Sequence, residues 1–546
     1  MAVSSAVRLL SAVVQHDASQ PADSVRAAEV IAALCLATDL ALGLPFEHGL
    51  HSTLFAMRLG ERLGVDAETA SRTYYACLLF YSGCTADAET AAELFPDETA
   101  LLTHFTPVMF GSRPEVMAGV MRALAVPGSP GPARAVQVAR RLPRAVRTHR
   151  GHLAALCEVA QMLTDRLGLP ASVRDLFPHL TERWDGKGEP GKVKGDAVPL
   201  PVRIVHVARD AAFQRALGGE AYAAQVMRDR AGHAFDPAIA TLLADQAAEV
   251  LALDDDVPAW DEALAREPVP HRTLDGEAIE RALAAMGDFA DLASPYLVGH
   301  SAGVADLACG AARRCGLESA ELIRIRRSAL VHDLGRVAVP VRIWQKAGPL
   351  TPDEWERVRL HAYHSERILM RSPFLTALAP VATAHHERVD GSGYHRGAGA
   401  AALGPAARLL AVVDAYHAMT EPRPHRESLK PADAAEILGR EARGGHLDID
   451  AVSAVLDTAG HARPRIGRPS GLTEREAEVV GLLARGLQTK QIARALGISV
   501  KTADRHVQNA YGKIGVSTRA AATLFAMEHG LAVWGELPMV PGGHRP

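Results

Sequence analysis

Much of the chain shows the spacing of apolar residues, at three and four positions, that is typical of amphipathic helices. This spacing is clear in 320–334 and 355–370. Further helices are predicted at 278–297, 430–443 and 448–459. Residues 30–46 are apolar but short and interrupted by Asp39, so we expect a buried helix there and not a membrane span. We find no convincing alternation of apolar and polar residues, so the pattern predicts an all-α fold.

The C-terminal part predicts a helix-turn-helix. Thr473 and Glu476 have the spacing of a capping box and open its first helix. A second helix at 490–496, a turn at 497–499 and a third helix at 500–514 follow. In this motif the third helix is the natural reader of the DNA major groove.

Polar side chains on and near this third helix are candidates for DNA contacts. Arg, Gln and Asn can read base edges, while basic side chains and the backbone at a helix N-cap can bind phosphates. The candidate DNA-binding residues are Lys490, Ser499, Lys501, Thr502, Arg505, His506, Gln508, Asn509 and Lys513. Residues 465–535 hold ten Lys and Arg against five Asp and Glu, a net charge of +5, although the whole chain has −4. The positive charge is concentrated where DNA would lie.

The rest of the chain contains an internal duplication. Segment 182–213 matches 387–419, since both open with Glu-Arg-x-Asp-Gly-x-Gly and end in an apolar helix that reaches an Asp. Upstream, 76–84 falls where 328–336 falls. The predicted division is a first copy at 1–250, a proline-containing joint at 251–275, a second copy at 276–461, a linker at 462–471, a DNA-binding domain at 472–535 and a tail at 536–546.

The second copy could hold metal ions. Imidazole nitrogens and carboxylate oxygens are ligands that borderline transition metals prefer, and side chains of neighbouring helices can converge on such ions. The candidate ligands are His300, His332, Asp333, His361, His385, His386 and Asp414. A carboxylate next to a His can bridge two metals, and two metals can activate water for attack on phosphorus. The sequence therefore predicts metal-assisted phosphodiester hydrolysis.

The first copy has lost this chemistry. Phe80 and Tyr81 stand in place of the His-Asp pair of the second copy, and neither can bridge metals as a carboxylate does. We expect the first copy to be a regulatory or dimerising unit. A vestigial ligand pocket around Asp185 and Lys187 is the alternative.

Four pieces of the second copy form an ordered series: VHDLGR at 331–336, HAYHSERIL at 361–369, HHERVDGSGYHRG at 385–397 and RLLAVVDAYHAM at 408–419. In order and spacing this series resembles the HD-GYP branch of the HD-domain phosphohydrolases. The resemblance implies a helical domain with an iron or manganese site that hydrolyses cyclic dinucleotides, chiefly cyclic di-GMP. It implies the metal-ligand role for the seven residues named above, a catalytic role for Asp333 and Arg336, and substrate contacts for Arg336, Asp390, Gly391, Gly393 and Tyr394.

Three departures from that family matter. Arg336 replaces a lysine, which keeps the charge but changes its geometry. His395 replaces the proline that stiffens the signature loop. Tyr296 stands where trinuclear members carry a Glu, which favours a site of two divalent ions.

The C-terminal segment also resembles a known family. LTEREAEVV from 472 and GLQTKQIARALGISVKTADRHVQNAYGKIGVSTRAAA from 486 match nearly every signature position of the LuxR/FixJ-type DNA-binding domain. The resemblance implies four helices and dimeric binding to a palindromic promoter site.

Composition indicates the cellular compartment that we expect for the protein. The chain is 48% hydrophobic and 22% charged, as is ordinary for a globular protein. Its six cysteines form no CxxC pair and indicate buried thiols in a reducing compartment. The N-terminus lacks the features of a signal peptide, so we expect a cytoplasmic protein without a membrane partner.

Three functions fit these features. In the first, the chain is a transcriptional regulator whose second copy binds or hydrolyses a cyclic dinucleotide or related phosphodiester and thereby biases promoter binding. In the second, it is foremost a metal-dependent phosphodiesterase that its C-terminal domain places at DNA. In the third, it is a transcription factor whose two helical copies are catalytically inert. Metal content and turnover separate them.

Overall fold

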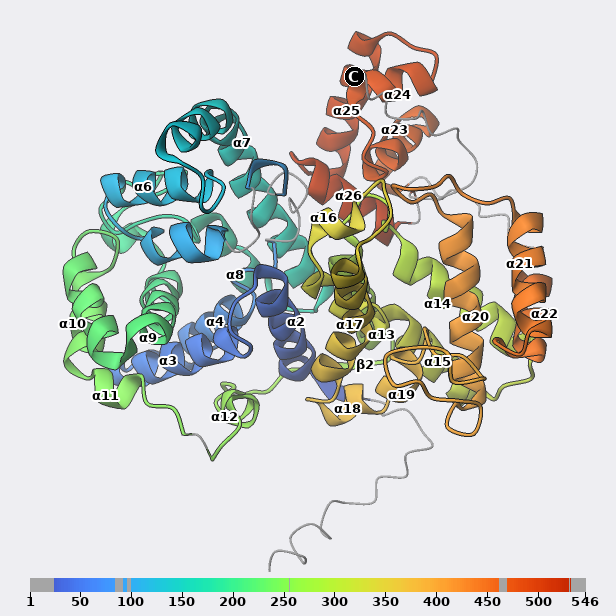
Figure 1. Ribbon diagram of the computed structural model, residues 1–546. Helices are drawn as coiled ribbons and strands as arrows, with labels where there is room; N and C mark the ends of the chain where they lie inside the picture. The colour runs from blue at the N-terminus through green and yellow to red at the C-terminus, as the bar shows by residue number, and fades with distance from the viewer. Residues whose placement is uncertain are drawn as a thin grey trace, which may run out of the picture.

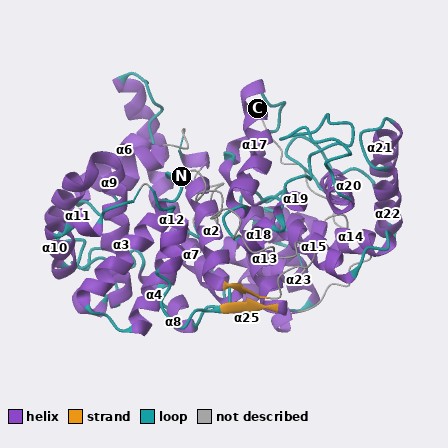
Figure 2. Cartoon of the chain, turned by 90° about the horizontal axis from the view of Figure 1, so that it is seen from below, coloured by secondary structure: helices purple, strands orange, loops and turns teal. Residues whose placement is uncertain are grey.

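A computed structural model describes residues 24–83, 92–95, 100–254, 256–460, 469–529 and 531. Figure 1 shows the helices of the first copy on one side, those of the second copy on the other, and the C-terminal helices on top. Figure 2 shows that helices and loops make up nearly the whole described chain. The predicted all-α class is confirmed.

The first copy contains long helices around a central one, α9. Its elements are α2 (Ala27–Leu42), α3 (His48–Leu63), α4 (Ala67–Leu78), η2 (Leu101–Phe105), η3 (Thr106–Val108), α6 (Arg113–Ala123), α7 (Gly131–Arg166), α8 (Ala171–Arg174), η4 (Phe177–His179), η5 (Gly195–Ala197), α9 (Leu200–Arg230), α10 (Pro237–Asp245) and α11 (Ala247–Val250). Helix α12 (Ala259–Ala265) lies in the joint. The Arg-rich segment 134–150 lies in the first half of α7.

The second copy repeats this plan with shorter connections. Its elements are α13 (Gly276–Asp291), α14 (His300–Arg314), α15 (Ser319–Val331), η6 (Leu334–Ala338), α16 (Val341–Trp344), α17 (Pro352–Leu369), α18 (Pro373–Thr376), α19 (Ala379–Ala382), α20 (Pro405–Thr420), α21 (Pro431–Arg443) and α22 (Ile449–Ala459). The helix predicted at 278–297 ends earlier, at Asp291. Two turns, closed by bonds from Leu297 to Ser294 and from His300 to Leu297, then lead into α14.

The C-terminal part has the predicted helix-turn-helix and one further helix. After the turn η7 (Pro469–Gly471), its elements are α23 (Glu474–Ala484), α24 (Thr489–Ala495), α25 (Val500–Ile514) and α26 (Arg519–Glu528). The capping box is present, because Thr473 Oγ1 accepts from the amide of Glu476 and the Glu476 carboxylate accepts from the amide of Thr473.

The sequence pattern did not predict one small two-stranded sheet. Strand β1 (Ser24–Arg26) pairs antiparallel with β2 (Thr273–Asp275), which places Val25 opposite Leu274. Each strand has only three residues and a single buried side chain, too short for alternation to be recognised. The pair ties the beginning of the first copy to the end of the joint.

Matching contacts support the duplication. The Asp39 carboxylate accepts from the amide of Gly49 at the start of α3, at 3.0 and 3.2 Å. At the equivalent place in the second copy, Asp291 accepts from the amide of Ser301 at 2.9 Å. A buried carboxylate therefore stabilises the N-terminus of the equivalent helix in each copy.

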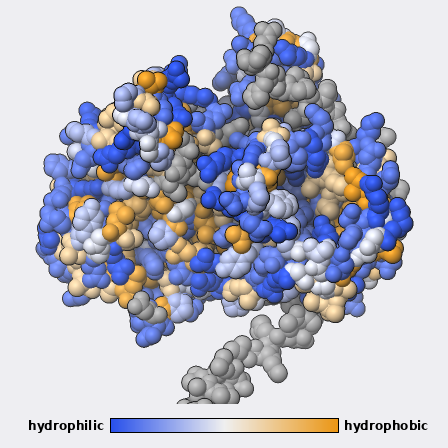
Figure 3. Space-filling model, viewed as in Figure 1, coloured by the Kyte–Doolittle hydropathy of each residue, from blue (hydrophilic) through white to orange (hydrophobic). Residues whose placement is uncertain are grey.

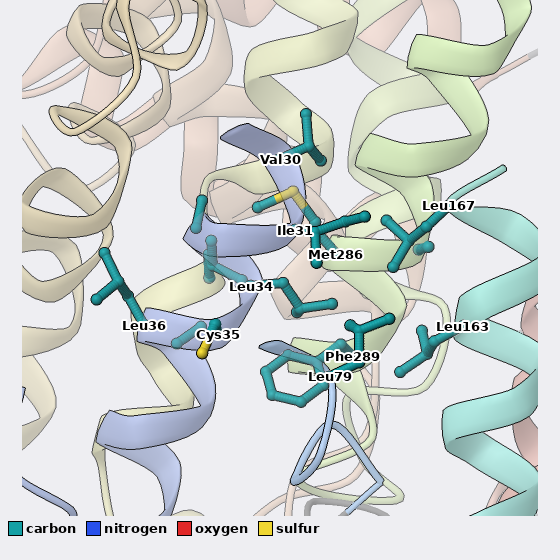
Figure 4. Packing of buried hydrophobic residues seen from close by; sticks show 14 of the residues in the cluster. Val30, Ile31, Leu34, Cys35, Leu36, Leu79, Leu163, Leu167, Met286 and Phe289 are labelled. Atoms are coloured by element: carbon teal, nitrogen blue, oxygen red, sulfur yellow. The ribbon is translucent and has the colours of Figure 1, made fainter. Parts of the chain in front are cut away.

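A single cluster of buried apolar residues runs through both copies and reaches α26. Figure 4 shows part of it: Ile31 of α2, Leu163 and Leu167 of α7, and Met286 and Phe289 of α13 gather in one place. Helix α2 also packs against η6 and α17 of the second copy. The two copies thus bury a common apolar surface, which is the main favourable term in their association.

Polar contacts reinforce this junction. Arg166 of α7 forms a buried ion pair with Asp288 of α13, at 2.6 Å. Arg371, which follows α17, forms an ion pair with Glu47 at 2.9 Å. The ring centroid of Phe46, the residue before Glu47, lies 3.8 Å from the guanidinium of Arg367. The first copy therefore makes polar contacts with the second through α7 and through the residues between α2 and α3.

The face of the molecule seen in Figure 3 mixes polar and apolar residues. No helix among the described residues is long and apolar enough to cross a membrane.

The C-terminal helices are docked on the two copies through α26. This helix packs against α7 and α13. Glu158 of α7 accepts from the amide of Ser517 at 3.0 Å and from the hydroxyl of Thr518 at 2.8 Å, just before α26 begins. The contact from an α7 carboxylate holds the start of α26 in place.

We expect Glu158→Gln to loosen this docking without unfolding the chain. Loss of a charge-assisted bond to a helix start costs about 1 kcal/mol. Amide hydrogen exchange across α26 should therefore rise about fivefold. Glu277→Gln, on an exposed ion pair of α13, is the matched control and should leave α26 unchanged. Equal exchange in the wild type and in Glu158→Gln would show that the apolar contact of α26 is sufficient.

Candidate metal centre and nucleic-acid interface

The structure brings all seven predicted metal ligands together, although they come from separate segments of the second copy. His300 is the first residue of α14, His332 and Asp333 follow α15, His361 lies in α17, His385 and His386 follow α19, and Asp414 lies in α20. All are buried except His386, which is partly exposed. The possible ligand atoms form two groups. The first group contains His300, His332, Asp333 and Asp414, and the second contains His361, His385 and His386.

Asp333 lies between these two groups. Its Oδ2 is 3.5 Å from Nε2 of His300 and 3.1 Å from Nε2 of His332. Its Oδ1 is 3.3 Å from Nε2 of His361 and 3.4 Å from Nε2 of His385. Each oxygen of one carboxylate thus faces a different group, which is the arrangement expected of a bridging ligand.

Backbone carbonyls orient three of the histidines. Each Nδ1 lies within hydrogen-bond distance of the carbonyl three residues earlier: His332 and Ala329 at 2.7 Å, His361 and Val358 at 2.5 Å, His385 and Ala382 at 2.7 Å. With Nδ1 held by a carbonyl, Nε2 of each ring is directed at Asp333. Such hydrogen bonds on the far nitrogen are typical of metal-binding histidines.

Several buried atoms in this centre have no hydrogen-bond partner. They are Nε2 of His332 and both carboxylate oxygens of Asp333, although Oδ2 of Asp333 lies in an ion pair with Arg336. Unpartnered buried polar atoms are costly and rare in folded proteins. A mixed set of imidazole and carboxylate donors suits divalent ions such as iron and manganese. The residues of this centre therefore fit the predicted metal ions.

The pKa shifts of Asp333 and His386 agree with that fit, whereas His332 differs: burial lowers its pKa, but the Asp333 and Asp414 carboxylates raise it to about 9. Burial opposes ionisation of Asp333, but Arg336 and His332 hold the pKa of its carboxyl well below the ordinary value. Burial and the neighbouring His385 hold the pKa of His386 well below its ordinary value. At neutral pH this gives a charged carboxylate and a neutral imidazole, the forms that bind metals.

Sequence reasoning missed two residues beside this centre, His417 and Glu421. Glu421 is buried, and its carboxylate lies 2.9 Å from Nδ1 of His300 and 3.1 Å from Nδ1 of His417. With His300 they form a third group of possible ligands. His417 lies one helical turn after Asp414 on α20, which was the available signal.

We expect Glu421→Gln to weaken metal binding about 10- to 100-fold, as loss of a carboxylate behind a metal-binding His does. Because His300 presents Nε2 to Asp414 at 3.1 Å, Glu421 on its other nitrogen fixes the ring and increases its basicity. Titration of manganese against a fluorescent chelator measures the change. Glu436→Gln, on the exposed side of α21, is the control, and equal affinity in both variants would contradict this role for Glu421.

Arg336 belongs to the same centre. It lies in η6, is buried, and its Nη2 is 2.5 Å from Oδ2 of Asp333. Its guanidinium also lies 5.1 Å from the ring centroid of Trp344. Nε and Nη1 have no hydrogen-bond partner, so two donors of a fixed cation remain available beside the carboxylate.

The signature loop is only partly directed at this centre. The ring of Tyr394 stacks on His386, with centroids 4.6 Å apart. A Cβ on Gly393 would lie 2.5 Å from backbone atoms of 386–388, so only glycine fits there. Asp390 instead bonds Ser392 within the loop, and its carboxylate lies 2.7 Å from Nδ1 of His446.

Asp390 therefore stabilises the conformation of the signature loop. Bonds from the hydroxyl and amide of Ser392, together with His446, lower the pKa of Asp390 to about 2. Gly391, next to it, has a φ of 80°, which glycine adopts without strain. Tyr394 is thus the member of the predicted substrate loop that reaches the ligand cluster.

The first copy has a different centre. The guanidinium of the buried Arg209 lies 4.3 Å from the ring centroid of Phe80 and 3.7 Å from that of Tyr81. Asp210 forms a buried ion pair with Arg230. No group of possible metal ligands occurs in the first copy among the described residues. A cation–π stack stands where the sequence has lost the His-Asp pair.

The candidate DNA-binding residues lie on and around α25. A small core that includes Ile492, Ala503 and Val507 holds α25 against α24. Exposed residues of the set are Lys490, Ser499, Lys501, Arg505, Gln508, Asn509 and Lys513, and Thr502 and His506 are half-buried. Ser499 caps α25 by accepting from the amide of Thr502 at 3.1 Å. The Lys513 ammonium lies 2.6 Å from the Glu476 carboxylate, so it ties α25 to α23.

Two families of known proteins match the chain. Residues 130–239 and 284–450 match the HD domain, one segment in each copy. Residues 470–526 match the luxR family of bacterial regulatory proteins.

Several relatives match over long stretches. The chain is 28% identical over 433 residues to the 3′3′-cGAMP-specific phosphodiesterase 3 of Vibrio cholerae, which covers 78% of this chain and 93% of that protein. It is 35% identical over 167 residues to a cyclic di-GMP phosphodiesterase of Pseudomonas aeruginosa, covering 30% of this chain and 40% of that protein. The chain thus spans less than half the length of this second relative.

A solved structure shares the arrangement of helices. It is that of a cyclic GMP-AMP specific phosphodiesterase of V. cholerae, with a TM-score of 0.55 and 23% sequence identity. The match covers 81% of this chain and 99% of that one. The likeness supports the fold of the two copies.

Proposed function

Because this chain belongs to the HD-domain family and carries a luxR-type domain at its C-terminus, we propose that it is a DNA-binding transcriptional regulator whose second copy hydrolyses a cyclic dinucleotide. The observation that carries the catalytic part is the position of Asp333, with one carboxylate oxygen toward each group of histidines. The relatives supply the substrate class, since those named above act on 3′3′-cGAMP and on cyclic di-GMP.

The residues of the second copy would hold two divalent ions. His300, His332 and Asp414 would hold one divalent ion, His361, His385 and His386 the other, and Asp333 both. Bound there, such ions supply Lewis-acid polarisation of the phosphate and an activated water.

Arg336 would bind the phosphate of the substrate. Its Nε and Nη1 lack partners, and a guanidinium fork matches the geometry of two phosphoryl oxygens. Because the charge of Arg336 does not depend on pH in the physiological range, it stabilises the negative charge that builds up on the phosphoryl oxygens. Asp333 meanwhile keeps the histidines oriented through their Nε2 atoms.

A ligand sensor without turnover is the second candidate. The observation that favours it is the ion pair between Arg336 and Asp333, at 2.5 Å. If this pair persists with ligand bound, Arg336 neutralises the bridging carboxylate and hydrolysis fails although binding remains.

DNA binding is the other half of the proposal. The luxR-type match and the exposed basic and amide side chains of α25 support it. We propose a homodimer on a palindromic promoter, with ligand occupancy of the second copy changing promoter affinity. Helix α26 packs against α13 of the second copy, which provides a physical route for this coupling.

The test uses purified full-length protein loaded with manganese and incubated with 3′3′-cGAMP and cyclic di-GMP. Chromatography should show linear dinucleotide or mononucleotides, and EDTA should abolish their formation. Binding without product would establish the sensor instead. Absence of both binding and product would leave only the DNA-binding role.

A further inference from the structure

Helix α17 carries, beside His361, a row of side chains at the surface, of which Trp355 and Tyr363 are exposed and Arg359 is half-buried. Trp355, Arg359 and Tyr363 follow at intervals of four residues and therefore share one face of the helix. Trp355 is 44% exposed and Tyr363 is 43% exposed. Aromatic residues make up only 5% of the chain, so two of them exposed on one helix face is unusual.

Trp355 is also the only exposed tryptophan among the described residues. Leaving a large aromatic ring in water forfeits the free energy of burying it. Exposed rings grouped together therefore indicate a surface that binds something.

The row is continuous with the metal centre through the signature loop. The ring centroid of Trp355 lies 6.4 Å from that of Tyr394, at an interplanar angle of 71°. The guanidinium of Arg359 lies 5.5 Å from the Tyr394 centroid. Tyr394 in turn stacks on the metal ligand His386. Aromatic rings thus lead from the ligand cluster to the surface at α17.

We infer that Trp355, Arg359 and Tyr394 form a stacking platform for a purine base of the substrate. This inference rests on the proposed function, because it assumes that a nucleotide phosphate binds at Arg336 and Asp333. A base is joined to that phosphate through a ribose, so it must lie beside the centre and not within it. Aromatic rings and guanidinium groups are the side chains that stack on bases.

The alternative occupant, an apolar protein segment, fits less well. The charge of Arg359 lies in the middle of the row, and Tyr394 joins the row to a buried cluster of metal ligands. A flat base can stack on one of these rings and meet the other edge-on, and the carbonyl oxygen of guanine can accept from the Arg359 guanidinium.

The experiment compares wild-type protein with Trp355→Ala and Trp355→Phe. Substrates are 3′3′-cGAMP and methyl p-nitrophenyl phosphate, a phosphodiester without a base. In Trp355→Ala the KM for 3′3′-cGAMP should rise about 10-fold or more while kcat changes little, since stacking on one ring contributes this much to base binding. Trp355→Phe should retain most of the affinity. Hydrolysis of methyl p-nitrophenyl phosphate should be the same in all three proteins.

A binding measurement gives a readout apart from turnover. GMP titrated into wild-type protein should quench tryptophan fluorescence, and Trp355→Phe should lose most of that quenching. Met370→Ala, at the end of the same helix and 53% exposed, is the control for surface truncation.

The outcomes separate the two proposals. If wild-type protein hydrolyses 3′3′-cGAMP and Trp355→Ala has the same KM and the same quenching, the platform is refuted and the proposed function stands. If wild-type protein neither binds nor cleaves 3′3′-cGAMP, the proposed function fails and the platform fails with it.

Discussion

Asp333→Asn should abolish hydrolysis and strip the protein of its metal ions. The substitution keeps the size of the side chain but removes the charge that lies between the two groups of histidines. Loss of a residue that merely supports a metal ligand costs about 10- to 100-fold in affinity or activity, and loss of the bridging ligand should exceed that. Plasma emission spectroscopy should find about two metal ions per wild-type chain and fewer than one per variant chain.

The first copy offers a matched control. Tyr81 occupies the position that corresponds to Asp333, and Tyr81→Phe changes one polar atom there as Asp333→Asn does. Metal content and turnover should be unchanged in Tyr81→Phe. If Asp333→Asn retains both ions and full activity, the carboxylate does not bridge and the proposed chemistry is wrong. Circular dichroism verifies that both variants are folded.

Replacing Lys501 and Arg505 together by Ala should reduce promoter affinity by two orders of magnitude or more. Both side chains are exposed on α25, away from the small core that anchors it. A base contact by Arg contributes about 1–3 kcal/mol, and each lost phosphate contact lowers the slope of log affinity against log salt by about one. Fluorescence anisotropy at several salt concentrations measures both quantities.

Lys430→Ala with Arg440→Ala is the control for loss of positive charge. Both residues are exposed and belong to the second copy, far from α25 in sequence. Promoter affinity and salt slope should stay as in the wild type. If the α25 variant also binds as the wild type does, α25 does not read the promoter, and the DNA-binding proposal would need another surface.

Local sequence signals predicted the helices well. Helix α25 has the predicted bounds, and Thr473 and Ser499 act as the predicted N-caps. These features depend on spacing and on hydrogen bonds between residues close in sequence, which a single sequence contains. The gathering of the metal ligands was predicted from residue types in a known order, and the structure agrees.

Features made by packing between distant segments were not predictable in this way. Glu421 approaches His300 only because the chain turns after α20, and no periodicity signals that contact. The stacking of Arg209 on Phe80 likewise follows from two helices meeting. The docking of α26 on α7 depends on an apolar face that a helix-turn-helix would be expected to expose or to use in dimerisation.

The packing of α2 against η6 bears on how such a chain changes over generations. The first copy, whose described residues include no group of possible metal ligands, packs through α2 against the turn η6 that carries Arg336. A chain shortened to the second copy would expose the apolar surface that the first copy covers, and it would tend to aggregate. Arg336 would also lose part of the packing that positions its guanidinium. If the proposed hydrolysis is under selection, the first copy would therefore be retained together with the second copy that it supports.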